Sequence, residues 1–191
     1  MQLLLASQSP RRRELLTALG FAVRFINIHV DETLDRPFPA DQIAETLALR
    51  KSQGYDNSNL NDDEVLVTAD TVVVHQQQVL GKPQDIDDAR RMLRMLSGDK
   101  HQVFTGVCLK SSRHQRSFTE KTDVWFKQLT ESEIDHYTTH YACLDKAGSY
   151  GIQDWIGMIG IERIDGCYYN VMGLPTARLY KELQAFLPDI H

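Results

Sequence analysis

The segment Leu3–Arg13 reads LLLASQSPRRR and joins a short apolar run to a polar and basic turn. The run Leu3–Ala6 is bounded at once by polar residues, which is typical of a buried strand. Ser9 is a favourable N-cap and Pro10 suits a first helical position, so we predict a helix that continues to Leu19. The segment therefore predicts a strand, a tight turn and a helix in direct succession.

Three consecutive arginines, Arg11, Arg12 and Arg13, fall in the first turn of that helix. Because the helix dipole disfavours cations there, they lower helix stability unless a negative group binds among them. Backbone N–H groups, the Ser7 and Ser9 hydroxyls and the guanidinium groups together form a cradle suited to phosphate. The alternative is a solvated basic turn whose arginines pair with surface carboxylates. A P-loop is excluded, because the chain contains no G-x-x-x-x-G-K-[ST] sequence.

The composition is that of an ordinary globular protein, with 191 residues, 42% hydrophobic and 25% charged. This length suits one large domain or two small lobes around a shared cleft. The net charge of −5 argues against a general nucleic-acid binder. Three widely spaced cysteines, without zinc spacing, indicate a reducing compartment. Since no apolar run approaches a membrane span and no signal-peptide pattern is present, we expect a cytoplasmic protein without membrane contact.

A second informative stretch, Val65–Val74, reads VLVTADTVVV and predicts a strand buried on both faces. Asp70 interrupts it, and a carboxylate in such a run is costly unless it is paired, hydrogen-bonded or metal-bound. We therefore predict that Asp70 is a site carboxylate with Thr71 as its hydroxyl neighbour. The alternative is a β-bulge or strand end with a satisfied aspartate. Glu32, in a loop after another expected strand, is either a metal ligand or a solvated acid.

Two lysines, Lys82 and Lys146, occupy positions that suggest contacts with phosphate, whereas Lys51 has an ordinary place at the end of a helix. Lys82 lies in the return strand of a hairpin after Val65–Val74, which would bring it close to the Asp70 strand. Lys146 lies in the glycine-punctuated segment Leu144–Gln153, where glycines let backbone approach a ligand. Lys51 lies near the end of a predicted helix, where a cation also suits the dipole. For each lysine a purely structural surface or loop role remains the alternative.

The remaining patterns predict helices and strands in mixed order. We expect strands over Phe21–Ile28, His101–Leu109 and Phe118–Phe126, and helices over Ala40–Gln53, Asp85–Leu96, Thr130–Tyr141 and from Gly173 to about Phe186. The dipeptide Asp165-Gly166 predicts a short hairpin between Met158–Ile164 and Tyr168–Met172. Because crossovers and hairpins alternate, the chain predicts an α/β fold with a mixed sheet.

Five motifs, taken in order, resemble the Maf family of nucleotide pyrophosphatases. They are LASQSPRR, the TADT around Asp70, LGKP at Leu80–Pro83, DKAGSYGIQ at Asp145–Gln153 and VMGLP at Val171–Pro175. The resemblance implies a fold similar to the inosine triphosphate pyrophosphatases: an elongated mixed sheet flanked by helices, with two lobes around a nucleotide cleft. It also implies a single family domain over residues 1–191.

The resemblance further implies an enzyme, a hydrolase of nucleoside triphosphates. It would cleave between the α and β phosphates, giving the monophosphate and pyrophosphate, with a divalent cation such as Mg²⁺ or Mn²⁺. The YGIQ ending of the fourth motif is similar to the branch that acts on dTTP and UTP. By this resemblance, Asp70 matches the proton acceptor for the attacking water. Glu32 matches an acid near the metal, and Asp70 would also lie near that metal.

Other positions match those of the family by motif. Those that set nucleotide preference correspond to Arg11, Thr71 and Gln153, and polar pocket positions correspond to Ser7, Arg12, Lys51, Lys82 and Lys146. The sequence around Lys51, LALRKSQG, departs from the family pattern.

Two other functions are left open by the sequence. One is the same chemistry on 7-methyl-GTP or a modified nucleotide. The other is a nucleotide-binding regulator of cell division or septum formation, against which Asp70 argues, because a carboxylate repels polyphosphate. A homodimer is also open: the apolar side chains of Trp155, Ile156, Met158 and Ile159 would form either an interface or core.

Overall fold

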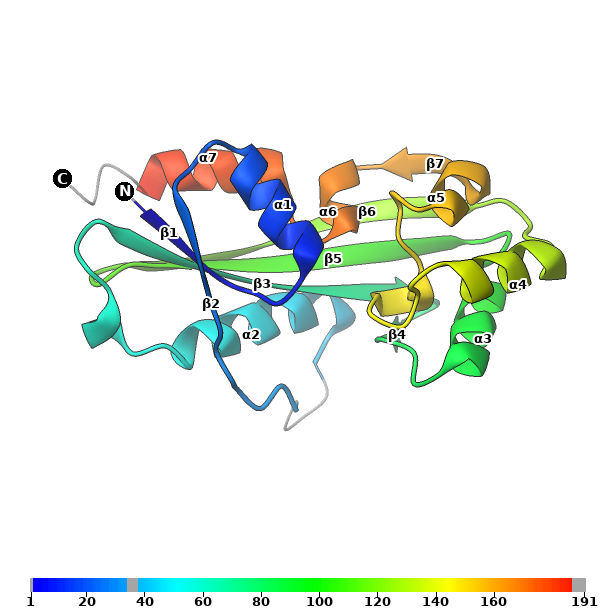
Figure 1. Ribbon diagram of the computed structural model, residues 1–191, viewed down its shortest axis with the longest axis horizontal. Coiled ribbons are helices and arrows are strands. Elements are labelled where there is room, and N and C mark those ends of the chain that lie inside the picture. The colour runs from blue at the N-terminus through cyan, green and yellow to red at the C-terminus, as the bar shows by residue number, and fades with distance from the viewer. Residues whose placement is uncertain (1, 34–37, 187–191) are drawn as a thin grey trace. The chain divides into compact units, whose positions relative to one another are not determined.

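The computed structural model describes residues 2–33 and 38–186, which form alternating strands and helices (Figure 1). The strands are β1 (Gln2–Ala6), β2 (Val23–Ile26), β3 (Glu64–His75), β4 (Gln78–Leu80), β5 (Lys100–Lys110), β6 (Gln115–Phe126) and β7 (Ile161–Asp165). The α-helices are α1 (Pro10–Ala18), α2 (Ala40–Gln53), α3 (Ile86–Leu96), α4 (Glu131–His140), α5 (Trp155–Gly160), α6 (Tyr168–Met172) and α7 (Thr176–Phe186). Within the described ranges, no helix has the length and apolar character needed to cross a membrane.

The strands form one seven-stranded sheet in the order β2-β1-β3-β5-β6-β7, with β4 paired to β3. Strand β1 runs parallel to both β2 and β3, whereas the β3–β4 and β6–β7 pairs are antiparallel. The predicted α/β class with a mixed sheet is therefore confirmed. The hairpin predicted after Val65–Val74 is also present, with positive φ at Gln76 and Gln77, but its return strand β4 ends at Leu80, so Lys82 lies beyond that strand.

The chain divides into two compact units. Unit 1 comprises the described parts of Met1–Asp70, Thr105–Glu120 and Gly173–His191, and unit 2 comprises Thr71–Phe104 and Lys121–Met172. Strands β3, β5 and β6 contribute residues to both units. The single family domain and the nucleotide cleft expected between two lobes stay predictions.

In unit 1, helices cover both faces of the sheet, with α1 and α7 on one face and α2 on the other (Figure 1). The three leucines of β1 are fully buried, as their apolar run predicts. Helix α2 approaches β5 so closely that a Cβ added at Gly106 would lie 2.2 Å from the Glu45 backbone nitrogen. The Thr68 hydroxyl of β3 also donates to the Ala48 carbonyl of α2, at 2.6 Å. These contacts fix α2 against the middle of the sheet.

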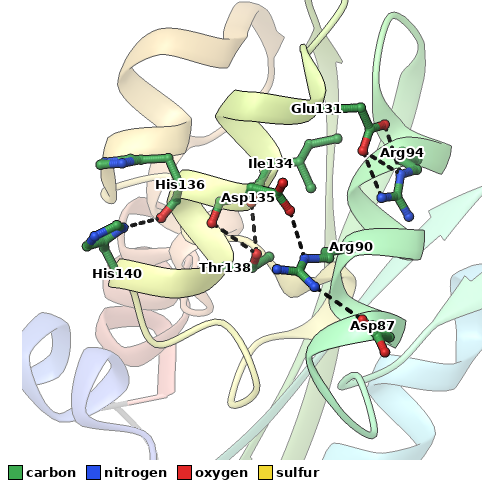
Figure 2. Close-up of polar contacts among 9 residues, drawn as sticks. All are labelled: Asp87, Arg90, Arg94, Glu131, Ile134, Asp135, His136, Thr138 and His140. Carbon is green, nitrogen blue, oxygen red and sulfur yellow. Dashed lines mark hydrogen bonds and ion pairs between the residues drawn. The ribbon is translucent and has the colours of Figure 1, made fainter.

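In unit 2, α3 and α4 pack together and share ion pairs on their exposed sides (Figure 2). Arg94 Nη2 lies 2.7 Å from Glu131 Oε2, and Arg90 Nε lies 3.0 Å from Asp135 Oδ1. Helix α4 begins with the capping box predicted at Thr130, whose side chain accepts from the Glu133 N–H. The apolar side chains of both helices enter one continuous core.

The hairpin predicted around Asp165-Gly166 is wrong, although the part of its first strand from Ile161 onward is present as β7. Met158 belongs to helix α5, and Tyr168–Met172 forms the short helix α6. Strand β7 pairs with β6 instead. The helical turn of α6 places Asn170 inside the protein, where its amide donates to the Val103 carbonyl at 3.1 Å and to the Thr122 hydroxyl at 3.0 Å. This buried polar contact with distant residues overrides the local turn signal.

The close approach of α2 to β5 can be tested with Gly106→Ala. The added methyl group would meet helix backbone, which cannot rotate away, so we expect the free energy of unfolding to fall by about 3 kcal/mol. Gly81→Ala is the matched control, because a Cβ at Gly81 would have nothing within 4 Å. The free energy of unfolding of both variants can be measured by urea unfolding. An equal decrease in the two variants would contradict this packing.

Candidate active site

Three polar segments of unit 1 lie at the level where β1 and β2 end beside β3, which itself continues to His75. Ala6, the last residue of β1, is in register with Ile26 of β2 and with Thr68 of β3. The carboxyl ends of parallel strands meet at one edge of a sheet, which is a common location for ligand sites. The segments that continue from this edge contain Ser7–Arg13, Glu32 and Asp70. The parallel register therefore gathers residues that are far apart in the sequence.

Lys51 joins the two carboxylates of this group. Its ammonium lies 2.5 Å from Asp70 Oδ1 and 3.3 Å from Glu32 Oε1. The Lys51 and Asp70 side chains are only 16% and 15% exposed, whereas that of Glu32 is 55% exposed. Lys51 lies in the last turn of α2, so the packing of α2 on the sheet brings it to Asp70. Asp70 is thus a paired carboxylate in an otherwise buried strand, one of the states that its sequence context requires.

The arginine turn is built as the sequence predicts, and its arginines have different surroundings. Ser9 caps α1, Pro10 occupies its first turn, and Arg12 Nε donates to the Gly173 carbonyl at 2.8 Å. Burial lowers the pKa of Arg12, an effect opposed by the negative charges of Asp70 and Glu32. Arg12 is therefore directed into the protein near these carboxylates and is not part of a solvated turn.

The other residues of the turn support its shape. Arg13 Nε donates to the Ser7 carbonyl at 3.1 Å, and its guanidinium carbon lies 5.0 Å from the centre of the Phe25 ring. The Ser7 hydroxyl accepts from the Ser9 N–H at 3.2 Å. Arg11 is half-buried, and its charge is among those that lower the pKa of Arg12. A turn with this density of positive charge is suited to an anion.

The chemistry of the donor set fits a divalent cation that arrives with phosphate ligands. Asp70 and Glu32 contact the same ammonium, so two carboxylate groups face one small region. Among residues 2–33 and 38–186, no cluster of three or more His, Cys, Asp or Glu side chains could hold a metal ion. Mg²⁺ is typically bound through one or two carboxylates together with substrate phosphates and water. The residues therefore fit a substrate-dependent Mg²⁺ site and not a closed protein cage.

In unit 2, the structure brings together two of the predicted segments. The Gly148 N–H donates to the Gly81 carbonyl at 3.0 Å, which joins the DKAGSYGIQ segment to LGKP. Lys82, next to Gly81, is exposed. Thr71, the first residue of unit 2, is half-buried in β3. Gly148 and Ser149 both have positive φ, and such a conformation in serine is uncommon outside functional segments and turns.

Lys146 and Gln153 lie in this segment in different electrostatic surroundings. Lys146 is buried, and its ammonium lies 2.9 Å from Asp145 Oδ1 and 3.4 Å from Asp154 Oδ2. It also donates to the Ala142 carbonyl. Gln153 is half-buried, and within the described part of the chain its buried Oε1 accepts no hydrogen bond. An unsatisfied buried acceptor is unusual and is suited to a ligand that carries an N–H group.

Two buried residues that contact this segment, Tyr137 and His101, were not predicted as site residues. The Tyr137 hydroxyl contacts both Gly151 and Asp154, and His101 Nε2 lies 2.6 Å from the Tyr150 hydroxyl. Tyr137 follows the apolar periodicity of α4, so the sequence marks it only as core. His101 lies in a strand and carries no local signal of its partner. Within the segment, the hydroxyl of Tyr150 is the sequence feature that calls for a polar partner when the side chain is buried.

The comparisons with known proteins agree with this arrangement. The chain matches the Maf-like protein family over residues 2–186 and belongs to that family. It is 48% identical over 184 residues to a dTTP/UTP pyrophosphatase of Phocaeicola vulgatus, covering 96% of this chain and 95% of the relative. A dTTP/UTP pyrophosphatase of Bacillus cereus is 43% identical over 189 residues, covering 99% and 97%. The structure of the Staphylococcus aureus Ham1 protein has the same fold, with a TM-score of 0.53, 13% identity and full coverage of both chains.

The His101–Tyr150 contact generates a prediction about pH. Burial lowers the pKa of His101 from 6.5 to about 3, so the unfolded chain binds more protons between these two values. The free energy of unfolding should therefore fall as pH falls, by about 2 kcal/mol between pH 6.5 and pH 5 from this group alone. His101→Gln keeps a polar partner for Tyr150 and removes the titration. Urea unfolding at pH 7 and pH 5 should show this smaller pH dependence, and an equal dependence in both proteins would contradict the burial of a neutral histidine.

Proposed function

We propose that this protein hydrolyses dTTP and UTP between the α and β phosphates, giving the nucleoside monophosphate and pyrophosphate. Similarity over nearly the whole length to relatives named dTTP/UTP pyrophosphatases carries this proposal. The charges of the described residues support it. Unit 1 presents arginines and a lysine for phosphate beside a largely buried carboxylate, a combination suited to phosphate-anhydride hydrolysis.

In the proposed reaction Asp70 is the proton acceptor. A water oxygen forms a bond to the α-phosphorus, the bond from that phosphorus to the bridging oxygen breaks, and pyrophosphate leaves. The proton of the water passes to an Asp70 carboxylate oxygen. The contact with Lys51 Nζ, at 2.5 Å, holds this carboxylate in a fixed position before substrate arrives. Such pre-organisation lowers the cost of reaching the transition state.

The cations of the family motifs are assigned to the phosphates. A nucleoside triphosphate carries about four negative charges, which must be offset before water can attack. Arg12 is suited to this task, because its guanidinium group is held in place by the Gly173 carbonyl. Lys82 is exposed and therefore accessible to an anion. Lys51 and Lys146 contact carboxylates, and each ammonium would share its protons between those carboxylates and phosphate oxygens.

We assign the divalent cation, Mg²⁺ or Mn²⁺, to Glu32 and Asp70. When bound with the substrate it would supply positive charge to the phosphate oxygens. Glu32 is the more exposed of the two acids, so it can turn toward an arriving ion at little cost. Lys51 already offsets part of their charge.

The base preference is assigned to Gln153, together with Arg11 and Thr71 as the family positions imply. The buried Gln153 Oε1 lacks a donor among the described residues. Uracil and thymine carry an N–H group at N3, whereas cytosine has an acceptor there. An amide can accept from that N–H group and donate to a neighbouring carbonyl of the base. The free acceptor thus favours dTTP and UTP over CTP.

The cellular compartment, the class of binding partner and the homodimer contact are also part of the proposal. The three free cysteines agree with a reducing cytoplasm, and the negative net charge agrees with a small-molecule substrate in place of nucleic acid. Ile156 is fully buried in the core, whereas Met158 is 73% exposed. Of the apolar residues considered for a homodimer contact, Met158 is therefore available and Ile156 is not.

The function is tested by pyrophosphate release from a panel of triphosphates, with wild type beside Asp70→Asn. We expect wild type to prefer dTTP and UTP with Mg²⁺, and EDTA to abolish release. Asp70→Asn should lower kcat by about 100- to 10,000-fold while nucleotide binding survives, because the amide cannot accept the proton. A preference for 7-methyl-GTP or a modified nucleotide would show that the enzyme has that substrate instead of dTTP and UTP. Binding without release from any nucleotide would favour the regulator of division or septum formation.

The role of Gln153 is tested by Gln153→Glu. The carboxylate keeps an acceptor but loses the amide donor, so it pairs poorly with the carbonyl groups of uracil and well with the amino group of cytosine. We expect the ratio of kcat/KM for UTP over CTP to fall by about 10- to 100-fold, with a smaller change in the best kcat. An unaltered preference profile would remove Gln153 from base recognition.

A further inference from the structure

The hydroxyl of Tyr137 is a buried connection between helix α4 and the Lys146–Gln153 segment. Tyr137 is fully buried, and its hydroxyl oxygen lies 2.8 Å from Asp154 Oδ2. The same oxygen accepts the Gly151 N–H at 3.0 Å. The hydroxyl thus uses both its donor and its acceptor on residues that flank Gln153. A phenylalanine would fill the same core volume but could make neither hydrogen bond.

These two contacts hold both ends of a tight turn. The Asp154 N–H donates to the Gly151 carbonyl at 3.0 Å, which closes the turn around Gln153. A Cβ at Gly151 would lie 2.4 Å from Asp154 Oδ2 and 2.9 Å from Gln153 Nε2. The turn is therefore packed against the side chains that it carries. Its orientation sets the direction in which the Gln153 amide is presented.

Asp154 extends the network to Lys146. The Asp154 Oδ2 atom that accepts from Tyr137 also lies 3.4 Å from the Lys146 ammonium. One carboxylate oxygen therefore connects the phenol to the lysine. Because burial and the neighbouring Asp154 raise the pKa of Tyr137, the hydroxyl keeps its proton and remains a donor.

Helix α4 is a rigid support for this network. Its first turn is fixed by the capping box, and its exposed side is joined to α3 by the Arg90–Asp135 and Arg94–Glu131 ion pairs (Figure 2). The ring of Tyr137 stacks on that of Tyr141, with the centroids 5.2 Å apart. A side chain whose position is locked by packing is suited to orient a neighbouring loop segment.

We propose that Tyr137, acting through Gly151 and Asp154, is a positioning residue that sets Gln153 and Lys146 for the nucleotide. This inference rests on the proposed function, because it concerns how the same triphosphate is recognised. Tyr137 itself need not touch the substrate. Its hydroxyl would raise affinity and base discrimination by holding the segment in its bound form, so that less ordering is needed when the nucleotide binds.

The test is Tyr137→Phe, with Tyr141→Phe as the matched control. Among the described residues, no hydrogen bond joins the Tyr141 hydroxyl to this network. We expect Tyr137→Phe to raise KM for dTTP and UTP by about 10-fold and to lower the UTP over CTP preference by at least about 3-fold, with a smaller change in kcat. Tyr141→Phe should retain the wild-type values. Amide hydrogen exchange at Gly151 should accelerate only in Tyr137→Phe, which gives a readout that needs no nucleotide.

Asp154→Asn separates the two branches of the network. The amide oxygen still accepts from Tyr137, so Gly151 should stay protected, while one of the two carboxylate charges beside Lys146 is lost and that of Asp145 remains. We expect KM to rise by a similar factor for every triphosphate, with base preference retained. This variant also tests the proposal if Tyr137→Phe fails to fold, because an unchanged KM in Asp154→Asn would then overturn it.

Two results would overturn the inference directly. One is a Tyr137→Phe protein with wild-type KM, base preference and Gly151 exchange. The other is a loss of kcat alone, equal for all nucleotides. The proposed function fails separately, if wild type releases no pyrophosphate. In that event, the affinities of wild type and Tyr137→Phe for dTTP can still be compared by calorimetry in EDTA. Equal affinities, or no binding to either protein, would overturn the positioning role as well.

Discussion

The ion pair between Lys51 and Asp70 is the interaction on which the proposed chemistry of unit 1 depends. A carboxylate within a strand that is otherwise buried is costly unless a partner offsets its charge. That partner comes from the end of α2, so the helix must lie close to the sheet. Gly106 permits this approach, and the Thr68 hydroxyl holds the Ala48 carbonyl of the helix. The parallel register of β1, β2 and β3 then brings the arginine turn and Glu32 to the same edge.

The two units carry different kinds of polar chemistry. Unit 1 gathers ionised groups, with Asp70, Glu32 and Lys51 in contact and Arg12 nearby. Unit 2 adds buried hydroxyls beside its Lys146–Asp154 ion pair, and burial raises the pKa of both Tyr137 and Tyr150. Ionised groups suit the binding of phosphate and the transfer of a proton, and neutral hydrogen bonds suit the discrimination of bases. The division of roles proposed for the residues follows this difference in charge.

Much of the fold could be predicted from local patterns, because those patterns report local physics. Ser9, Pro10 and the apolar run before them define the first strand and helix, and Thr130 with Glu133 defines the start of α4. The strand–helix alternation gives the mixed sheet. The Asp165-Gly166 signal failed because the buried amide of Asn170, with partners more than 40 residues away in the chain, decides the conformation there. A contact between residues so far apart in the chain cannot be predicted from a short stretch of sequence.

The candidate site was predictable in part, for a related reason. Asp70 stands out because a charge contradicts its apolar surroundings, and the arginines stand out because they oppose a helix dipole. Lys51 had an ordinary explanation as a helix-ending cation, and only the fold reveals its contact with Asp70. Tyr137 matches the apolar stripe of α4, so no local pattern marks it as a site residue or a supporting residue. Residues that act through a hydrogen bond to a distant segment need the structure to be found.

The central claim is the position of bond cleavage, and the most direct test is to identify the products formed from dTTP. Phosphorus NMR of the reaction with Mg²⁺ resolves pyrophosphate from inorganic phosphate, and chromatography resolves dTMP from dTDP. The account predicts dTMP and pyrophosphate in equal amounts from the first turnovers. Formation of dTDP with inorganic phosphate, or recovery of intact dTTP, would contradict it.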